Sequence, residues 1–345
     1  MKIDTHSHMT DNGIPLPDMM RAMKAGFDRS GFDAVCFASD TSAGFDAMHK
    51  NLLCFLYKLM YPKSCYIFAS LDYHIPGTGY DNYGFGRQAE IFAQIGVDGF
   101  HMYEGKPNAR KACGNIPLTG EKYRPFFSFL ERHSLPVALH PADPPEFWDI
   151  NYLEAYPFEK GWFFDDLTHS SYREIWDEVL AVAKAYPKLK IILPQFGFLL
   201  PDLPKMANLL DTHSNLHFDA GPMPVFYELC AHSKTETRAF LEKFSSRVLF
   251  ACTGVCNDFT KAHEKAEKQY AAISSLGLSE GITTALYAGN FTAMCPHKPL
   301  NTTALADYCS FIAQRLDKCP PAPSRNPAIQ RTKEAIAAIR ALLPA

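Results

Sequence analysis

The sequence lacks a membrane-spanning run, a secretory leader and a strong excess of charge of either sign. No apolar stretch in its 345 residues approaches the roughly 20 residues that a transmembrane helix needs. A polar, histidine-rich segment stands at the amino terminus, where a signal peptide would carry an apolar core. The formal net charge of −3 provides no basic field for nucleic acid or an anionic membrane surface. We therefore expect a cytoplasmic protein without a nucleic-acid or membrane partner.

Cysteine is not scarce, but the close pairs that mark many zinc or redox sites are absent. None of the ten cysteines belongs to a Cys-x-x-Cys pair. In a long chain without an export signal, such thiols are expected to be reduced and mostly buried.

Short apolar segments alternate with segments of helical periodicity along most of the chain. Strands that alternate with helices imply parallel βαβ units, and eight such units favour a (β/α)8 barrel over an open sheet. We predict an α/β (β/α)8 TIM barrel over residues 1–300 and a C-terminal helical extension packing on it over residues 301–345. The expected strands begin near Ile3 and at 34–38, 65–71, 96–102, 135–140, 189–193, 216–219 and 247–251, and the expected helices cover 15–27, 45–61, 87–95, 119–133, 172–186, 203–210, 236–244 and 261–276.

The first predicted strand ends in a pair of histidines two residues apart, His6 and His8. On an extended strand, residues i and i+2 point to the same side, so both imidazoles could meet one metal ion. Neutral imidazole is a common ligand of zinc and related metals. Taken alone, the motif fits two unrelated surface histidines equally well.

Polar residues also end several of the other predicted strands. In a (β/α)8 barrel the active site is built from the carboxyl ends of the strands and the loops after them. Convergence from separate strands therefore supports an active site, with a small-molecule substrate, more strongly than any single motif. These residues are His6, His8, His101, His140, Gln195, Asp219, Cys252 and Thr253.

A long aromatic segment follows the predicted fifth strand, over residues 141–171. An aromatic insertion at this place suits a lid or a subunit contact. It suits a satellite hydrophobic cluster beside the main core equally well. Barrels with such insertions and C-terminal helices commonly pair as C2 dimers, so a homodimer is compatible with the sequence.

Six ordered motifs between residue 3 and about residue 291 carry a family resemblance. They are IDTHSH at Ile3–His8, GFHMYEGKP at Gly99–Pro107, LHPADP at Leu139–Pro144, LPQFG at Leu193–Gly197, RVLF at Arg247–Phe250 and LYAGN at Leu286–Asn290. In this order they resemble the amidohydrolase superfamily, in the branch of metal-dependent TIM-barrel hydrolases related to aminocarboxymuconate semialdehyde decarboxylase.

The resemblance implies that His6, His8 and His140 bind a metal ion. Gln195 stands where the family has a histidine that orients or deprotonates the attacking water, and Thr253 stands where it has an aspartate ligand. A glutamine cannot act as a general base near neutral pH. A threonine neither neutralises a cation nor takes a proton as a carboxylate would.

The first functional hypothesis is a metal-dependent hydrolase of a small-molecule C–N or C–O bond, or a decarboxylase of a small carboxylic acid. Zinc would be held by His6, His8 and His140, with open positions for catalysis. His101, which stands where relatives often have lysine, would extend the ligand set or act as acid or base. Glu104 follows three residues later and could face the same mouth.

The missing anionic ligand could come from Cys252, Cys256 or Asp258, since thiolates and carboxylates both bind zinc. For Cys252, a small buried residue at a strand end is the commoner interpretation.

Two further hypotheses remain. One is a catalytically degenerate barrel that binds a small molecule or serves as a scaffold, because a fold does not imply a function. The other is a metal-free lyase that works by positioning and proton transfer. Its acid and base groups would be His101, His140, His6 and Glu104, and its substrate would be held by Gln195 and Thr253.

Overall fold

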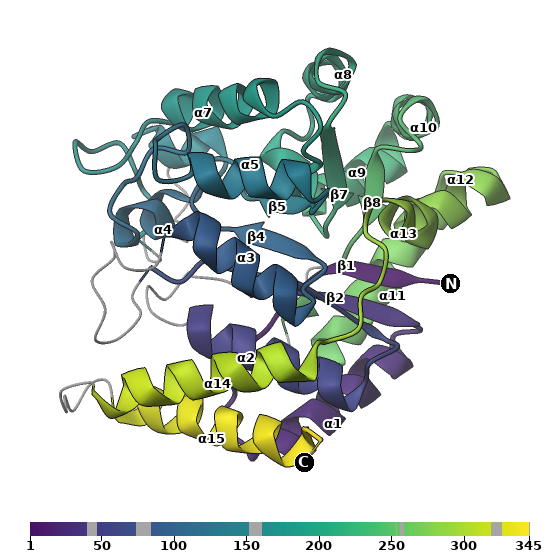
Figure 1. Cartoon of the computed structure of the whole chain (residues 1–345). Helices are drawn as coiled ribbons and strands as arrows, with labels where there is room; N and C mark the ends of the chain where they lie inside the picture. The colour runs from purple at the N-terminus through teal and green to yellow at the C-terminus, as the bar shows by residue number, and fades with distance from the viewer. Residues whose placement is uncertain are drawn as a thin grey trace.

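Eight parallel strands form a nearly closed barrel that helices surround (Figure 1). The computed structural model describes residues 1–39, 47–73, 84–151, 161–252, 254–255, 259–318 and 326–344. Each strand from β1 to β8 pairs in parallel with the next along the sequence, so the predicted (β/α)8 TIM barrel is confirmed. The strands are β1 (Ile3–His8), β2 (Ala34–Ala38), β3 (Cys65–Ala69), β4 (Gly99–Met102), β5 (Val137–Leu139), β6 (Ile191–Leu193), β7 (Leu216–Ala220) and β8 (Val248–Phe250).

The barrel closes between β8 and β1 through side chains and a short extra strand. Among the described strands, β1 is paired with β9 (Gly254–Val255) rather than with β8. The Thr5 hydroxyl donates a hydrogen bond to the Phe250 carbonyl at 2.8 Å. The Cys252 backbone N–H donates to Asp4 Oδ1, also at 2.8 Å. Polar side chains of β1 therefore replace ladder hydrogen bonds at this seam.

The helices that follow the strands lie close to their predicted positions. The helix expected from residue 119 begins only at Arg124, because residues 118–123 form turns and Pro125 sets the first helical turn. Four helices of five to nine residues were not predicted, because they are too short to show a clear period. The helices are α1 (Leu16–Arg29), α2 (Ala47–Met60), α3 (Phe85–Ile95), the unpredicted α4 (Pro107–Ala112), α5 (Arg124–Arg132), α7 (Tyr172–Ala185), α8 (Leu203–Thr212), the unpredicted α9 (Pro224–His232), α10 (Lys234–Lys243), α11 (Phe259–Ser275), the unpredicted α12 (Glu280–Thr284) and α13 (Asn290–Met294), α14 (Thr302–Asp317) and α15 (Asn326–Leu342).

The apolar core has two layers, as expected for a barrel whose strands are buried on both faces. One cluster fills the barrel interior and includes Ile3, Cys36, Ala138 and Leu249. A larger cluster lies between the strands and the surrounding helices. The eight described cysteines are all buried, as expected, and none of them forms a disulfide with another described residue.

A buried ion pair ties α2 to the start of β4. Lys58 and Asp98 have side chains that are 1% and 0% exposed, and they form a very short contact. Asp98 also accepts hydrogen bonds from the backbone N–H groups of Ile67 and Lys298. The aspartate thus joins β3, α2 and the segment that leads to α14.

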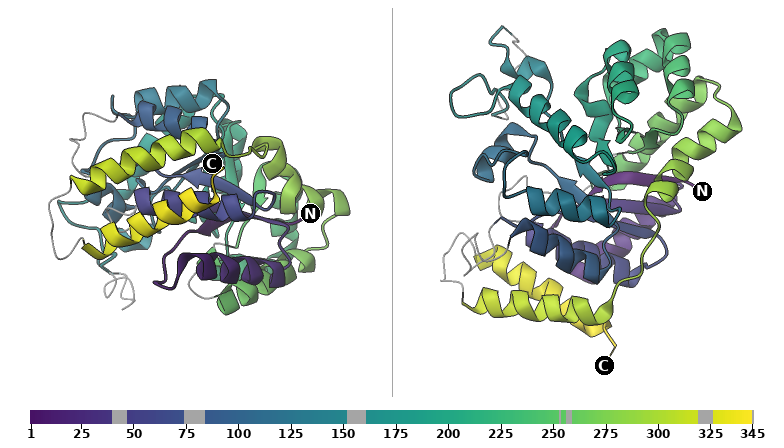
Figure 2. Two further views of the ribbon diagram at one scale, coloured as in Figure 1. Left: turned by 60° about the horizontal axis from the view of Figure 1, so that its bottom comes forward. Right: turned by 45° about the horizontal axis from the view of Figure 1, so that its top comes forward.

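The last two helices, α14 and α15, lie side by side on one flank of the molecule (Figures 1 and 2). α15 packs mainly against α2, and α14 against α3. Most of the proline-rich stretch predicted to separate them, over 320–327, falls in residues 319–325, outside the described part of the chain. No helix in the described residues is long and apolar enough to span a membrane.

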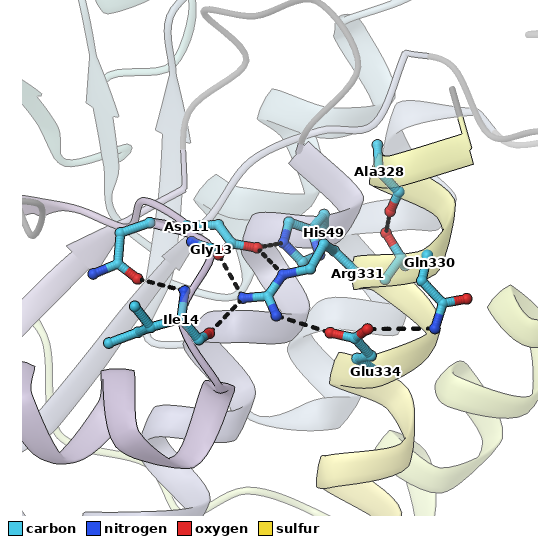
Figure 3. A network of polar contacts seen from close by, with 10 residues as sticks. Asp11, Gly13, Ile14, His49, Ala328, Gln330, Arg331 and Glu334 are labelled. Atoms are coloured by element: carbon cyan, nitrogen blue, oxygen red, sulfur yellow. Dashed lines mark hydrogen bonds and ion pairs between the residues drawn. The ribbon is translucent and has the colours of Figure 1, made fainter. Parts of the chain in front are cut away.

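An arginine of α15 fastens this helix to the loop that follows β1 (Figure 3). Arg331 donates from Nε and Nη2 to the two carboxylate oxygens of Asp11, at 2.9 and 2.6 Å. His49 of α2 lies 2.9 Å from the same carboxylate. Although burial raises it, the hydrogen bonds from His49 and Arg331 hold the pKa of Asp11 below its usual value. The C-terminal helix is thus connected to the segment next to His8.

Candidate active site

An irregularity in β1 turns its two histidines toward the barrel interior. Ile3 pairs with Ala34 and His8 pairs with Ala38, so β1 uses one residue more than β2 over this span. Strict alternation from the inward-facing Ile3 would place His6 and His8 on the outer face. The extra residue lies between Asp4 and Ser7 and reverses that phase. Both imidazoles consequently face the interior at the carboxyl end of β1.

Three imidazoles meet at this end of the barrel. His101 is the penultimate residue of β4, where it pairs with the inward-facing Ala138. The ring centroids of His6 and His8 are 4.7 Å apart, and that of His101 lies 5.4 Å from His6 and 5.8 Å from His8. His6 is 4% exposed and His101 is 1% exposed. The structure therefore brings together three of the predicted site residues from two strands.

Hydrogen bonds fix the ring orientation of His6 and His101. His6 Nδ1 lies 2.8 Å from Asp219 Oδ2, and His101 Nδ1 lies 2.9 Å from the carbonyl oxygen of Ser39. A carboxylate and a carbonyl can only accept, so each Nδ1 carries a proton and donates it to that oxygen. Both Nε2 atoms are buried. This is the arrangement that second-shell acceptors impose on metal-binding histidines.

Asp219 also holds the turn that carries Gln195. Its Oδ1 accepts hydrogen bonds from the backbone N–H groups of Gln195 at 2.7 Å and Gly221 at 3.0 Å. Gln195, Phe196 and Phe198 have positive φ angles of 52°, 53° and 55°. Side chains other than glycine seldom adopt this left-handed region, and such strain persists only where surrounding contacts impose it. The Asp219 carboxylate is one such contact.

His140 lies apart from the three clustered imidazoles. Its ring stacks on Tyr103 at 4.9 Å and an interplanar angle of 23°, and Phe198 lies 5.0 Å away on a tilted plane. The ring of Tyr103 is also 5.2 Å from His101. His140 Nε2 lies 3.1 Å from Asp143 Oδ1. Burial lowers the pKa of His140 against the opposing hydrogen bond from Asp143, so its imidazole is neutral at pH 7.

Glu104 lies among tyrosines. The Tyr73 hydroxyl donates to Glu104 Oε1 at 2.6 Å and lies 2.5 Å from the Tyr123 hydroxyl. Glu104 is 1% exposed, and burial raises its pKa to about 7 against the lowering effect of the Tyr73 hydrogen bond. No hydrogen bond or ion pair found among the described residues joins Glu104 to a histidine. The Glu104 carboxyl therefore contacts a tyrosine, whereas the ring of the adjacent Tyr103 contacts His101 and His140.

Of the three candidates for an anionic ligand, the structure describes only Cys252. Cys256 and Asp258 lie outside the described residues, as does Thr253 at the family's aspartate position. Cys252 is 1% exposed, and burial raises the pKa of its thiol well above the usual value. Without a cation beside it, this cysteine is therefore a thiol at neutral pH.

The donor chemistry of the cluster fits a transition metal, but its present geometry does not converge on one point. Within the described residues, no group of three or more histidine, cysteine, aspartate or glutamate side chains is arranged to hold a metal ion. His6 and His101, whose Nδ1 atoms are held by fixed acceptors, nevertheless bring imidazole nitrogens close to His8, and imidazole is a ligand of zinc and its neighbours. The three imidazoles lie close together, but in the described residues they do not form a complete metal-binding site.

Sequence reasoning assigned no role to three contributors. Asp219 was noted only as a residue at a strand end, and its contact with His6 depends on the pairing of distant strands. The Ser39 carbonyl has no side-chain signature. Tyr103 stood inside a recognised motif, where the neighbouring His101 and Glu104 gave stronger chemical signals.

Known proteins show similarity at two levels. A sequence model described as amidohydrolase matches residues 94–290. No curated protein has a sequence that matches the chain. The fold is similar to that of a 4-oxalomesaconate hydratase from Rhodopseudomonas palustris, with 17% identity, coverage of 92% of this chain and 100% of that one, and a TM-score of 0.51.

Two similar structures contain metals. A 5-carboxyvanillate decarboxylase from Novosphingobium aromaticivorans, complexed with manganese, has 13% identity, coverage of 85% of this chain and 95% of that one, and a TM-score of 0.55. An amidohydrolase from Burkholderia multivorans with bound zinc has 10% identity, coverage of 85% and 98%, and a TM-score of 0.52. At these identities the likeness concerns the fold.

Proposed function

Because the chain belongs to the amidohydrolase family, we propose that it is a metal-dependent hydrolase or decarboxylase of a small molecule bound at the carboxyl end of the barrel. The observation that carries this proposal is the cluster of His6, His8 and His101, whose rings lie within 6 Å of one another. A barrel presents its chemistry at this end.

The proposed ligands are His6, His8 and a third imidazole, with zinc as the expected ion. The family resemblance predicts His140 as the third ligand, whereas the ring contacts favour His101. A bound divalent cation would supply a Lewis acid that polarises a carbonyl or carboxyl oxygen of the substrate.

The residues around the cluster have separate tasks. Asp219 keeps His6 in one tautomer and fixes the turn at Gln195. The Gln195 amide can donate to or accept from a substrate oxygen, but it does not move a proton at neutral pH. The ring of Tyr103 forms an aromatic wall beside His101.

Zinc binding tests the proposal directly. The full chain, purified without a metal-binding tag, should bind about one equivalent of zinc in elemental analysis and in calorimetric titration with ZnCl2. His6→Ala and His8→Ala should abolish this binding, and His101→Ala should weaken it at least about tenfold, because each removes a nitrogen ligand. His232→Ala, at an exposed position in α9, is the matched control and should bind as the wild type does.

A metal-free lyase is the second candidate, favoured by the absence of a convergent ligand set in the described residues. It relies on the same histidines for proton transfer, with Asp219 orienting His6. No uptake of zinc, manganese or iron by the wild-type chain would exclude the metal-dependent proposal and favour the lyase.

A further inference from the structure

Lys106 places a cation at the carboxyl end of the barrel, in the loop that follows β4. Its backbone N–H donates to the Tyr103 carbonyl at 2.9 Å, which turns the chain back on itself. The residue before it, Gly105, packs so closely on the backbone of His140 that no Cβ fits there. This turn leaves the Lys106 ammonium beside the Tyr103 ring, with 5.6 Å from Nζ to the ring centroid.

A second aromatic ring reaches Lys106 from the aromatic segment after β5. The ring centroid of Trp162 lies 4.7 Å from Nζ, within the roughly 6 Å of a cation–π contact. Asn108 Nδ2 donates to the carbonyl of Gly161 at 3.0 Å, and Asn108 Oδ1 lies 3.1 Å from His169 Nε2. These contacts hold this part of the aromatic segment against the loop that carries Lys106.

The Lys106 ammonium keeps hydrogen-bonding capacity for a ligand. An ammonium has three donors. Its ion-pair partner in the described part of the chain is Asp143, whose Oδ1 lies 3.8 Å from Nζ, beyond hydrogen-bond distance. The same oxygen lies 3.1 Å from His140 Nε2, so Lys106 shares this carboxylate. The Lys106 side chain is 18% exposed: much of it is buried, but a ligand can reach it.

The ring of Tyr103 connects this cation to the histidine cluster. Its centroid lies 5.2 Å from that of His101 and 5.9 Å from that of His8. Because the same ring also lies beside Lys106, a molecule about as long as one aromatic ring can reach from the imidazoles to the ammonium. The aromatic faces beside the path suit a flat, partly apolar molecule.

We propose that Lys106 binds a carboxylate substituent of the substrate, remote from the bond that reacts, and that Tyr103 and Trp162 line this subsite. One ammonium matches a singly charged carboxylate through a charge-assisted hydrogen bond, whereas phosphate sites gather several N–H donors. This inference rests on the proposed function. It narrows the substrate to a small, flat acid and assigns Trp162 of the aromatic segment to substrate binding.

Tryptophan indole signals test the proposal at the subsite itself. The full chain is labelled with 15N-tryptophan, and its three indole N–H signals are assigned with Trp148→Phe and Trp162→Phe. Isophthalate is the probe, because it carries carboxylates on a flat ring, and isophthalamide is a neutral probe of similar shape. Isophthalate should shift the Trp162 signal and leave that of the buried Trp176 in α7 unchanged. Isophthalamide should shift neither signal.

Variants of the lysine extend the test. Lys106→Met keeps an apolar stem beside Trp162 but removes the charge, and should weaken isophthalate binding at least about tenfold. Lys106→Arg keeps the charge and should bind within about threefold of the wild type. Lys111→Met is the matched control: Lys111 is an exposed lysine of α4 whose Nζ donates to Thr168, and its loss should leave binding unchanged.

Three results would overturn the subsite. They are equal binding of isophthalate by the wild type and Lys106→Met, an equal Trp162 shift with isophthalamide, and no Trp162 shift up to about 10 mM isophthalate, where even a millimolar site is mostly occupied. Tighter binding of inorganic phosphate than of isophthalate would overturn the carboxylate specificity. The comparison of probes on the wild type gives an answer even if a variant fails to fold.

The outcomes also separate this inference from the metal-dependent function. The titrations are made without added metal and repeated with ZnCl2, and a failure in both conditions is the one that counts against the subsite. If the wild-type chain takes up no metal but isophthalate still binds through Lys106, the metal-dependent function fails and the subsite stands. If zinc binds but isophthalate does not, the subsite fails alone.

Discussion

Ionisation of the buried Glu104 should make the stability of the protein depend on pH. The carboxyl is 1% exposed, and in the described residues its Oε2 atom has no hydrogen-bond partner. Burial raises its pKa from 4.5 to about 7. At 1.36 kcal/mol per pKa unit, the ionised form costs the folded state about 3 kcal/mol.

The sign follows from proton binding in the two states. Below pH 4.5 the carboxyl is protonated in both the folded and the unfolded chain, so it carries no penalty. Between pH 4.5 and about 7 the unfolded chain releases the proton and the folded chain keeps it. The free energy of unfolding therefore falls by about 1.4 kcal/mol per pH unit across this window and levels off above it.

Glu104→Gln isolates this effect, because the amide keeps the shape and an acceptor for Tyr73 but does not titrate. Urea unfolding of the variant and the wild type should be compared at half-unit steps from pH 4.5 to 8. The difference in unfolding free energy should move by about 3 kcal/mol in favour of the variant as the pH rises. Glu121→Gln, whose side chain is 90% exposed, is the control. A difference that stays constant with pH would refute the buried, proton-holding carboxyl.

Other predictions concern the frame of the site. Lys58→Met leaves the buried Asp98 without its cation and should lower the free energy of unfolding by about 3–5 kcal/mol in urea titrations; a loss below 1 kcal/mol would mean that the pair contributes little. Gly105→Ala should yield little folded protein by circular dichroism, because the new Cβ would lie 1.7 Å from the backbone oxygen of His140. Gly281→Ala meets nothing within 4 Å and should leave stability unchanged or raise it by about 1 kcal/mol; equal effects of the two glycine changes would contradict the close approach at Gly105.

The sequence by itself determined the barrel and the end of it that carries the polar residues. Apolar runs such as 34–38 and the helical spacing within 15–27 are local patterns. They predict strands and helices because each element must bury an apolar face against another element. The same alternation of strands and helices predicted that His6, His101 and His140 lie at strand ends. Short helices such as α4 were not predicted, because six residues span fewer than two turns and show no clear period.

Only the tertiary structure decided how these side chains are used. The phase of β1 depends on one extra residue against β2, and a shift of one residue moves both histidines of β1 to the other face. The ring contacts of His101 with that pair join β4 to β1, which are distant in the sequence. Asp219 reaches His6 across 213 residues of sequence. Such contacts arise from strand register and rotamers, which are fixed by packing between distant segments and leave no local pattern in the sequence.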